Sequence, residues 1–110
     1  MVHEAKDVGP QRYRETFGRY FEDFEVGDVY EHRPGKTVTE YDNHLFTLLT
    51  LNTHPMHFDA EFAKQSEFKQ NLVVSPYTLA LLIGMSVTDV SQKAIANLGM
   101  DEVKFTAPVF

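Results

Sequence analysis

Three polar side chains whose types suit proton-transfer chemistry fall close together in the sequence: Asn52, His54 and His57. An imidazole moves protons efficiently near neutral pH, because its unperturbed pKa is about 6.5. An amide five residues earlier can hold a water molecule against such a base. Pro55 interrupts the run, which indicates a loop where polar side chains are exposed at the end of a rigid support. We therefore predict that these three residues form a site that activates water.

The spacing His54-x-x-His57 leaves other interpretations open. It would fit half of a metal site, but the chain has no cysteine, no further clustered histidine and no HExxH pattern, so no metal is expected. On spacing alone, two exposed loop histidines without a function are as good an interpretation as a catalytic pair. The other histidines have no partner in a recognisable catalytic or metal-binding pattern and are expected on the surface: His3, His32 and His44.

A longer helix is predicted before this loop and a short helix after it. Thr39 and Asp42 have the spacing of a capping box, although the usual acid at the third position is Glu or Gln. The residues that follow include apolar side chains at helical spacing: Tyr41, Leu45, Leu48 and Leu49. After the loop, Asp59 can cap a short helix that runs through Phe62 and Ala63.

A second strong helix is predicted from Ser75-Pro76, with Ser75 as N-cap and Pro76 at the first helical position. It runs through TLALLIGMSV and is apolar on every face. A helix without a polar face is a buried one, so we expect it to be the central helix of an α+β domain, wrapped by sheet.

Strands are predicted on both sides of these helices. Residues 21–40 hold turns at Gly27-Asp28 and Pro34-Gly35 with β-favouring residues between and after them. Near the end, alternate residues are apolar, as in a strand with one buried face: Val103, Phe105, Ala107 and Val109. Because only two or three strands can be counted, we expect an incomplete sheet, or one that a partner completes.

Composition limits the classes of function. The chain has 110 residues, no cysteine and a formal net charge of −6, and its positive residues are scattered among acids. These features argue against nucleic-acid and anionic-membrane partners. Residues 1–17 are polar and aperiodic and are expected to form a mobile or partner-dependent arm, and residues 18–110 one domain. With no secretion signal and no apolar run long enough to span a membrane, a cytoplasmic protein is expected.

Residues 49–68, LTLNTHPMHFDAEFAKQSEF, resemble the hydratase motif of the MaoC-like (R)-specific enoyl-CoA hydratases, roughly G-D-x-N-P-L-H-x-D followed by a short helix. Residues 21–30 resemble the family's first strand, 73–84 the start of its central helix and 102–110 a later strand. The resemblance covers residues from about 20 to 110. The sequence is most similar in look to the mesaconyl-CoA hydratase and β-methylmalyl-CoA dehydratase group, through residues 46–59 and 84–99.

The resemblance implies a hot-dog fold, in which a curved antiparallel sheet wraps a long helix and the sheets form a homodimer or higher homo-oligomer. It implies an acyl-CoA substrate, with no cofactor other than the coenzyme A of that substrate. In this family a carboxylate and a histidine hold one water, and a backbone N–H near the start of the central helix stabilises the enolate oxygen. By position, His57 is the base and Ser75 supplies the N–H, while Pro55 and Tyr77 are expected at the substrate. Core packing is the alternative for Tyr77.

Three departures from the family pattern matter. Asn52 stands where the family has Asp, and an amide cannot take a proton, so it could only orient the water. His54 replaces the motif Asn, and His57 would act with His54 or Asp59 as the missing acid. Ser75 precedes a proline without an N–H and could serve as a helix cap alone.

The expected function is a hydro-lyase that acts on a short enoyl-CoA, branched and dicarboxylic chains included. A catalytically silent hot-dog subunit or acyl-CoA-binding module is the alternative, motivated by Asn52 and the incomplete sheet. A thioesterase is disfavoured, because VVSPYT (residues 73–78) carries no carboxylate near the start of the central helix.

Overall fold

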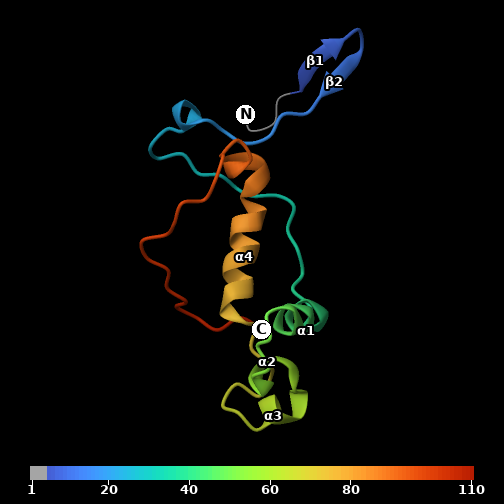
Figure 1. Ribbon diagram of the computed structural model, residues 1–110, viewed down its shortest axis with the longest axis vertical. Helices are drawn as coiled ribbons and strands as arrows, with labels where there is room; N and C mark the ends of the chain where they lie inside the picture. The colour runs from blue at the N-terminus through green and yellow to red at the C-terminus, as the bar shows by residue number, and fades with distance from the viewer. Residues whose placement is uncertain (1–4) are drawn as a thin grey trace. The chain divides into compact units, whose positions relative to one another are not determined.

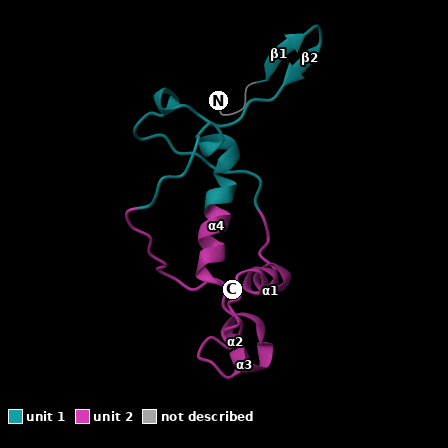
Figure 2. Cartoon of the chain, viewed as in Figure 1, with its two compact units in different colours: residues 1–35, 83–100 teal, residues 36–82, 101–110 magenta. Residues whose placement is uncertain are grey.

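The computed structural model describes residues 5–110, which combine helices with one small antiparallel sheet (Figure 1). The elements are β1 (Lys6–Gly9), β2 (Arg12–Arg14), α1 (Glu40–Leu49), α2 (Pro55–Phe58), α3 (Ala60–Lys64) and α4 (Ser75–Met85). Two short helical turns, Phe21–Asp23 and Val87–Ser91, complete them. Figure 2 shows two compact units, formed by residues 1–35 with 83–100 and by residues 36–82 with 101–110.

The first unit contains a hairpin in the arm, where the sequence showed no periodicity. β1 and β2 pair antiparallel, with Lys6 opposite Arg14. Gly9 has a φ of 143° and its N–H donates to the Asp7 carboxylate at 3.0 Å, which turns the chain before Pro10. The hairpin therefore comes from its turn residues and not from an apolar face.

Asp89 is a buried polar residue in the described part of the first unit. His32 Nδ1 lies 2.6 Å from its Oδ2, and Arg19 Nε donates to its backbone carbonyl at 3.1 Å. His32 is exposed, as expected, but the expectation that it has no chemical partner is wrong, because the partner lies far along the sequence. His3, expected on the surface as well, lies outside the described residues.

Gly18 is held by the turn at Val87–Ser91, since its N–H donates to the Thr88 carbonyl at 2.8 Å. Its φ is 78°, and a Cβ there would lie 2.6 Å from the backbone nitrogen of Lys93. Only glycine fits at this position.

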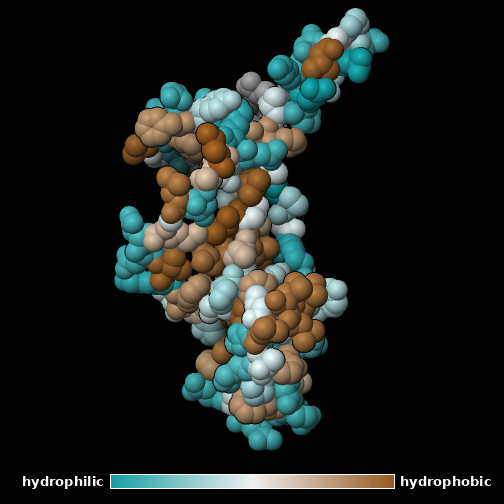
Figure 3. Space-filling model, viewed as in Figure 1, coloured by the Kyte–Doolittle hydropathy of each residue, from teal (hydrophilic) through white to brown (hydrophobic). Residues whose placement is uncertain are grey.

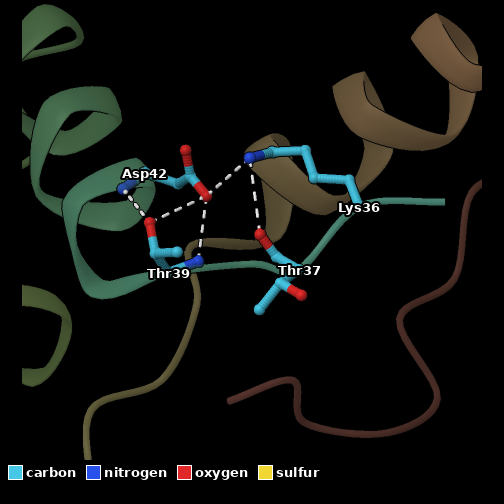
Figure 4. A network of polar contacts seen from close by, with 4 residues as sticks. All are labelled: Lys36, Thr37, Thr39 and Asp42. Atoms are coloured by element: carbon cyan, nitrogen blue, oxygen red, sulfur yellow. Dashed lines mark hydrogen bonds and ion pairs between the residues drawn. The ribbon is translucent and has the colours of Figure 1, made fainter. Parts of the chain in front are cut away.

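In the second unit, α1 begins with the predicted capping box (Figure 4). The Asp42 N–H donates to Thr39 Oγ1 at 3.3 Å, and the Thr39 N–H donates back to Asp42 Oδ2 at 2.9 Å. Lys36 Nζ lies 3.0 Å from the same oxygen. The Thr39 N–H, and then Lys36, hold the pKa of Asp42 below its ordinary value, while Asp42 raises the pKa of Lys36.

The lowered pKa of Asp42 predicts a pH-dependent contribution to stability. A carboxylate whose pKa is depressed in the folded state stabilises it above the ordinary value of 3.8, and this contribution is lost as the pH falls through the folded pKa. Asp42→Asn should therefore lower the free energy of unfolding at neutral pH, and the difference from the wild type should vanish in acid. Urea unfolding at several pH values measures it. Glu40→Gln, which removes a charge from the same turn and leaves the network of Figure 4 intact, should show a smaller gap at neutral pH.

The buried face of α1 is polar. Asn43 is 4% exposed and Thr47 1%, whereas Leu48 in the predicted apolar stripe is 68% exposed. Tyr41, Leu45 and Leu49 are exposed as well, and Figure 3 shows hydrophobic side chains gathered on the surface over α1. The periodicity thus predicted the helix correctly, but the face of α1 that is buried is the one that makes hydrogen bonds and not the apolar one.

Four apolar residues are buried in the described part of the chain: Met56, Ala63, Val73 and Val74. All belong to the second unit, where α2 lies against α1 and α3. The predicted cap of α3 is confirmed, since Asp59 Oδ1 accepts from the N–H groups of Glu61 and Phe62 at 3.0 and 3.2 Å.

Ala63 in α3 is fully buried, which makes it sensitive to added volume. Ala63→Leu should lower the free energy of unfolding by about 1–3 kcal/mol, because extra methylenes force their neighbours off their preferred rotamers. The shift of the urea midpoint measures this loss. Ala60→Leu places the same side chain at an exposed position of the same helix and should leave the midpoint close to that of the wild type. Equal shifts in both variants would contradict the prediction.

The expected buried central helix wrapped by sheet is not formed within residues 5–110. α4 has no buried residue, and Leu82 is among its exposed side chains. Residues 21–39 and 102–109 contain no strand, although the Val73 N–H donates to the Val109 carbonyl at 2.8 Å. The reason is that a period-2 pattern becomes a strand only where another strand pairs with it. No helix of the described part is long and apolar enough to cross a bilayer.

Candidate active site

The loop between α1 and α2 is built from local hydrogen bonds. Leu51 has a φ of 59°, and the Asn52 N–H donates back to the Thr47 carbonyl at 3.0 Å, as in a Schellman helix end. Asn52 Oδ1 then accepts from the His54 N–H at 3.2 Å. Asn52 therefore turns the chain into α2, and its amide oxygen is already engaged in doing so.

His54 is the N-cap of α2. Its Nδ1 accepts from the Met56 N–H at 3.1 Å, so that nitrogen carries no proton. The His54 ring lies edge-on to Phe62 and 5.8 Å, between centroids, from the ring of His57. The two histidines are thus neighbours, but the Nδ1 lone pair of His54 accepts the Met56 N–H and is not available to act as a base.

His57 has the opposite arrangement. Its Nδ1 lies 2.9 Å from the Leu72 carbonyl oxygen, which can only accept, so Nδ1 must donate. In the neutral ring the lone pair then resides on Nε2. A backbone carbonyl that sets the tautomer and orientation of an imidazole in this way is the usual support of a histidine base.

A cavity of about 100 Å³ brings His57 together with Ser75, which lies 18 residues later. Its lining residues come from α2, from residues 72–78 and from the C-terminal segment: His57, Leu72, Val73, Ser75, Thr78, Phe105, Ala107, Pro108 and Val109. The alternating apolar residues predicted near the C-terminus therefore line the cavity, although their segment is not a strand. A cavity of this size has room for ordered water or the reacting end of a small substrate.

Ser75 is the first helical residue of α4, so the helix begins one residue earlier than predicted. The Val74 carbonyl accepts from the Tyr77 and Thr78 N–H groups at 3.0 and 3.3 Å, so Val74 holds the place expected for Ser75. Among the described residues no hydrogen bond uses the Ser75 N–H. First-turn N–H groups have no acceptor within their helix and carry its positive dipole end, so they favour a negative charge.

The other predicted site residues do not line this cavity. Asn52 and His54 serve the turn and the cap described above. Pro55 is the first residue of α2, and its carbonyl accepts from the Asp59 N–H at 2.9 Å. Tyr77 packs edge-on against Phe46 with ring centroids 5.7 Å apart. Within residues 5–110, no three side chains of the metal-binding types converge on one point.

Asn43 is the residue of this site that sequence reasoning missed. Its amide contacts the backbone of His57 and Leu72, which line the cavity, and of Val74, which precedes Ser75. The sequence offers only a weak signal for it, an amide within a predicted helix between the apolar positions 41 and 45. An exposed side chain is the default expectation for such an amide.

One small cavity is thus lined by a histidine with an oriented ring and by a first-turn residue with an unpaired N–H, a combination suited to proton transfer beside a polarised carbonyl. Residues 23–110 match the family described as MaoC like domain. The chain belongs to this family.

Curated relatives include mesaconyl-CoA hydratase of Haloarcula marismortui, 36% identical over 92 residues, and beta-methylmalyl-CoA dehydratase of Chloroflexus aurantiacus, 32% identical over 93 residues. Each alignment covers 84% of this chain and 26% of the relative, so the chain spans about a quarter of their length.

A solved structure, described as monoamine oxidase regulatory protein from Archaeoglobus fulgius, is 34% identical with a TM-score of 0.70. The match covers 84% of this chain and 63% of that one.

Proposed function

We propose that this chain carries the water-activating site of a hydro-lyase that acts on a short enoyl-CoA thioester, branched and dicarboxylic chains included. The observation that carries the proposal is the cavity shared by His57, with its lone pair on Nε2, and the free N–H of Ser75. The printed names of the relatives, a hydratase and a dehydratase of CoA thioesters, support the same reaction class.

In the hydration direction, His57 Nε2 takes a proton from water while the hydroxyl oxygen bonds to the β-carbon of the enoyl thioester. The electron pair of the double bond moves through the α-carbon onto the thioester oxygen, which becomes an enolate. The Ser75 N–H donates to that oxygen and stabilises its charge. His57 then returns the proton to the α-carbon, so one water is added and the base is regenerated. Dehydration follows the same steps in reverse.

The remaining predicted residues have supporting roles in this proposal. Asn52 lies outside the cavity and supports the site through the turn into α2, where its amide oxygen accepts from the His54 N–H. His54 keeps α2, and with it His57, in place. Pro55 and Tyr77 contact the bound substrate outside the small cavity. The reaction needs no cofactor other than the coenzyme A that the substrate brings.

We also propose that the hot-dog sheet is completed in a homodimer or higher homo-oligomer in the cytoplasm. Two features support this. α4 has no buried residue, and segments 21–39 and 102–109, where the fold requires strands, have no strand to pair with in the described part of the chain. Size-exclusion chromatography with light scattering measures the oligomer directly.

The test is hydration of crotonyl-CoA and mesaconyl-CoA, followed as loss of the enoyl-thioester absorbance. Turnover of either substrate supports the proposal. A folded protein that binds these thioesters, by calorimetry, without turning them over would be a silent acyl-CoA-binding module, and the hydro-lyase proposal would be abandoned.

A further inference from the structure

Asn43 contributes an almost completely buried amide that binds the backbone of two residues lining the cavity, His57 and Leu72. Its Nδ2 donates to the His57 carbonyl at 2.7 Å and to the Leu72 carbonyl at 2.8 Å. Its Oδ1 accepts from the Val74 N–H at 3.0 Å. One side chain of α1 thus binds α2 and the segment before α4 at the same time.

The Leu72 carbonyl links this amide to the predicted base. It accepts both from Asn43 Nδ2 and, at 2.9 Å, from His57 Nδ1. A carbonyl oxygen has two lone pairs, so these two donors occupy both and hold the oxygen in one direction. The tautomer of His57 depends on that carbonyl, and the direction of the carbonyl depends on Asn43.

The same amide also reaches the other half of the site. Val74, whose N–H it binds, directly precedes Ser75, and the Val74 carbonyl accepts the first hydrogen bonds of α4. Asn43 therefore sets the spacing between the base and the first turn of α4. A misplacement of about 1 Å can lower a rate a hundredfold, so this spacing matters.

The chemistry of the position is demanding, because it needs two donors and one acceptor on one short side chain. Among the twenty side chains the carboxamide of Asn offers this set at this length. Asp has the same shape but no donor when ionised, and its charge would face two carbonyl oxygens. Thr47, on the same buried face one turn later, bonds only locally, through its hydroxyl to the His44 carbonyl at 2.8 Å.

We infer that Asn43 is a positioning residue of the hydration reaction, which holds the Leu72 carbonyl so that His57 keeps its proton on Nδ1 and its lone pair on Nε2. The inference rests on the proposed function for its catalytic consequence, but its structural consequence can be measured without turnover.

The experiment compares Asn43→Asp, Asn43→Gln and the control Thr47→Val with the wild type. The first readout is the tautomer of His57, from the ¹⁵N shifts of its ring at a pH where it is neutral. The wild type and Thr47→Val should show the proton on Nδ1, and Asn43→Asp a mixture of the two tautomers. The second readout is hydration of crotonyl-CoA, where Asn43→Asp should lower kcat by about 10–100-fold with KM changed by less than about threefold.

Asn43→Gln keeps the donors and the acceptor on a longer side chain and should recover part of the activity lost in Asn43→Asp. It also carries the test if Asn43→Asp does not fold. A wild-type tautomer and wild-type kcat in a folded Asn43 variant would overturn the inference. A wild type that shows the Nδ1 tautomer, loses it in Asn43→Asp and never hydrates an enoyl-CoA would instead refute the proposed function and leave the positioning role standing.

Discussion

His57→Ala is expected to lower kcat/KM for enoyl-CoA hydration by about 10²–10⁴-fold, the range associated with loss of a general base. The reason is that His57 lines the cavity and keeps an unshared lone pair on Nε2, because its Nδ1 proton is donated to the Leu72 carbonyl. His57→Asn keeps an N–H that can reach this carbonyl but has no basic lone pair. It should therefore be about as inactive as His57→Ala, while its stability stays closer to that of the wild type.

The matched control for His57 is His54→Asn. Asn is a good N-cap, so this variant keeps an acceptor for the Met56 N–H and should retain activity within a few-fold, roughly. Initial rates of crotonyl-CoA hydration, measured across pH, compare the three variants. If His57→Ala retained more than about a tenth of the wild-type rate, or if His54→Asn were the more damaging change, the base would have to be sought elsewhere.

Ser75→Pro is expected to have the second-largest effect, a loss of about 10²–10³-fold in kcat, because it removes the backbone N–H proposed to stabilise the enolate. Proline is well tolerated in the first turn of a helix, where the N–H has no acceptor within the helix. Circular dichroism checks that α4 remains.

Ser75→Ala separates the backbone of Ser75 from its side chain. It removes the hydroxyl but keeps the N–H, so its kcat should stay within about threefold of the wild type. An amide-to-ester substitution at residue 75 removes the same donor without the proline ring and should match Ser75→Pro. A large loss in Ser75→Ala would show that the hydroxyl, and not the N–H, acts on the substrate.

The local features of this chain could be predicted from its sequence. The capping box of Thr39 and Asp42 and the Asp59 cap of α3 are confirmed, because each depends on residues within three positions of one another. The start of α4 was predicted one residue too late, at Pro76, since either Val74 or Ser75 could precede the first turn. Helix ends carry this uncertainty when the deciding hydrogen bonds come from the backbone alone.

The longer-range features could not be predicted from local patterns. Asn52, His54 and His57 were grouped because they are close in sequence, whereas the cavity joins His57 to Ser75 and to residues 105–109. Ser75 was selected from the family resemblance and not from its own surroundings. Nothing local marks Asn43 as the amide that joins three segments, because its partners lie 14 to 31 residues away.

The opposite hydrogen-bonding roles of the two motif histidines impose different evolutionary constraints on them. Position 54 requires only an acceptor for one backbone N–H, and Asn, Asp, Ser or Thr could replace the imidazole there without moving α2. Position 57 requires a donor on one side of the ring and a basic lone pair on the other, a combination that only histidine supplies. Two identical residues three apart thus differ in replaceability, and only the second would be irreplaceable in a lineage that keeps the reaction.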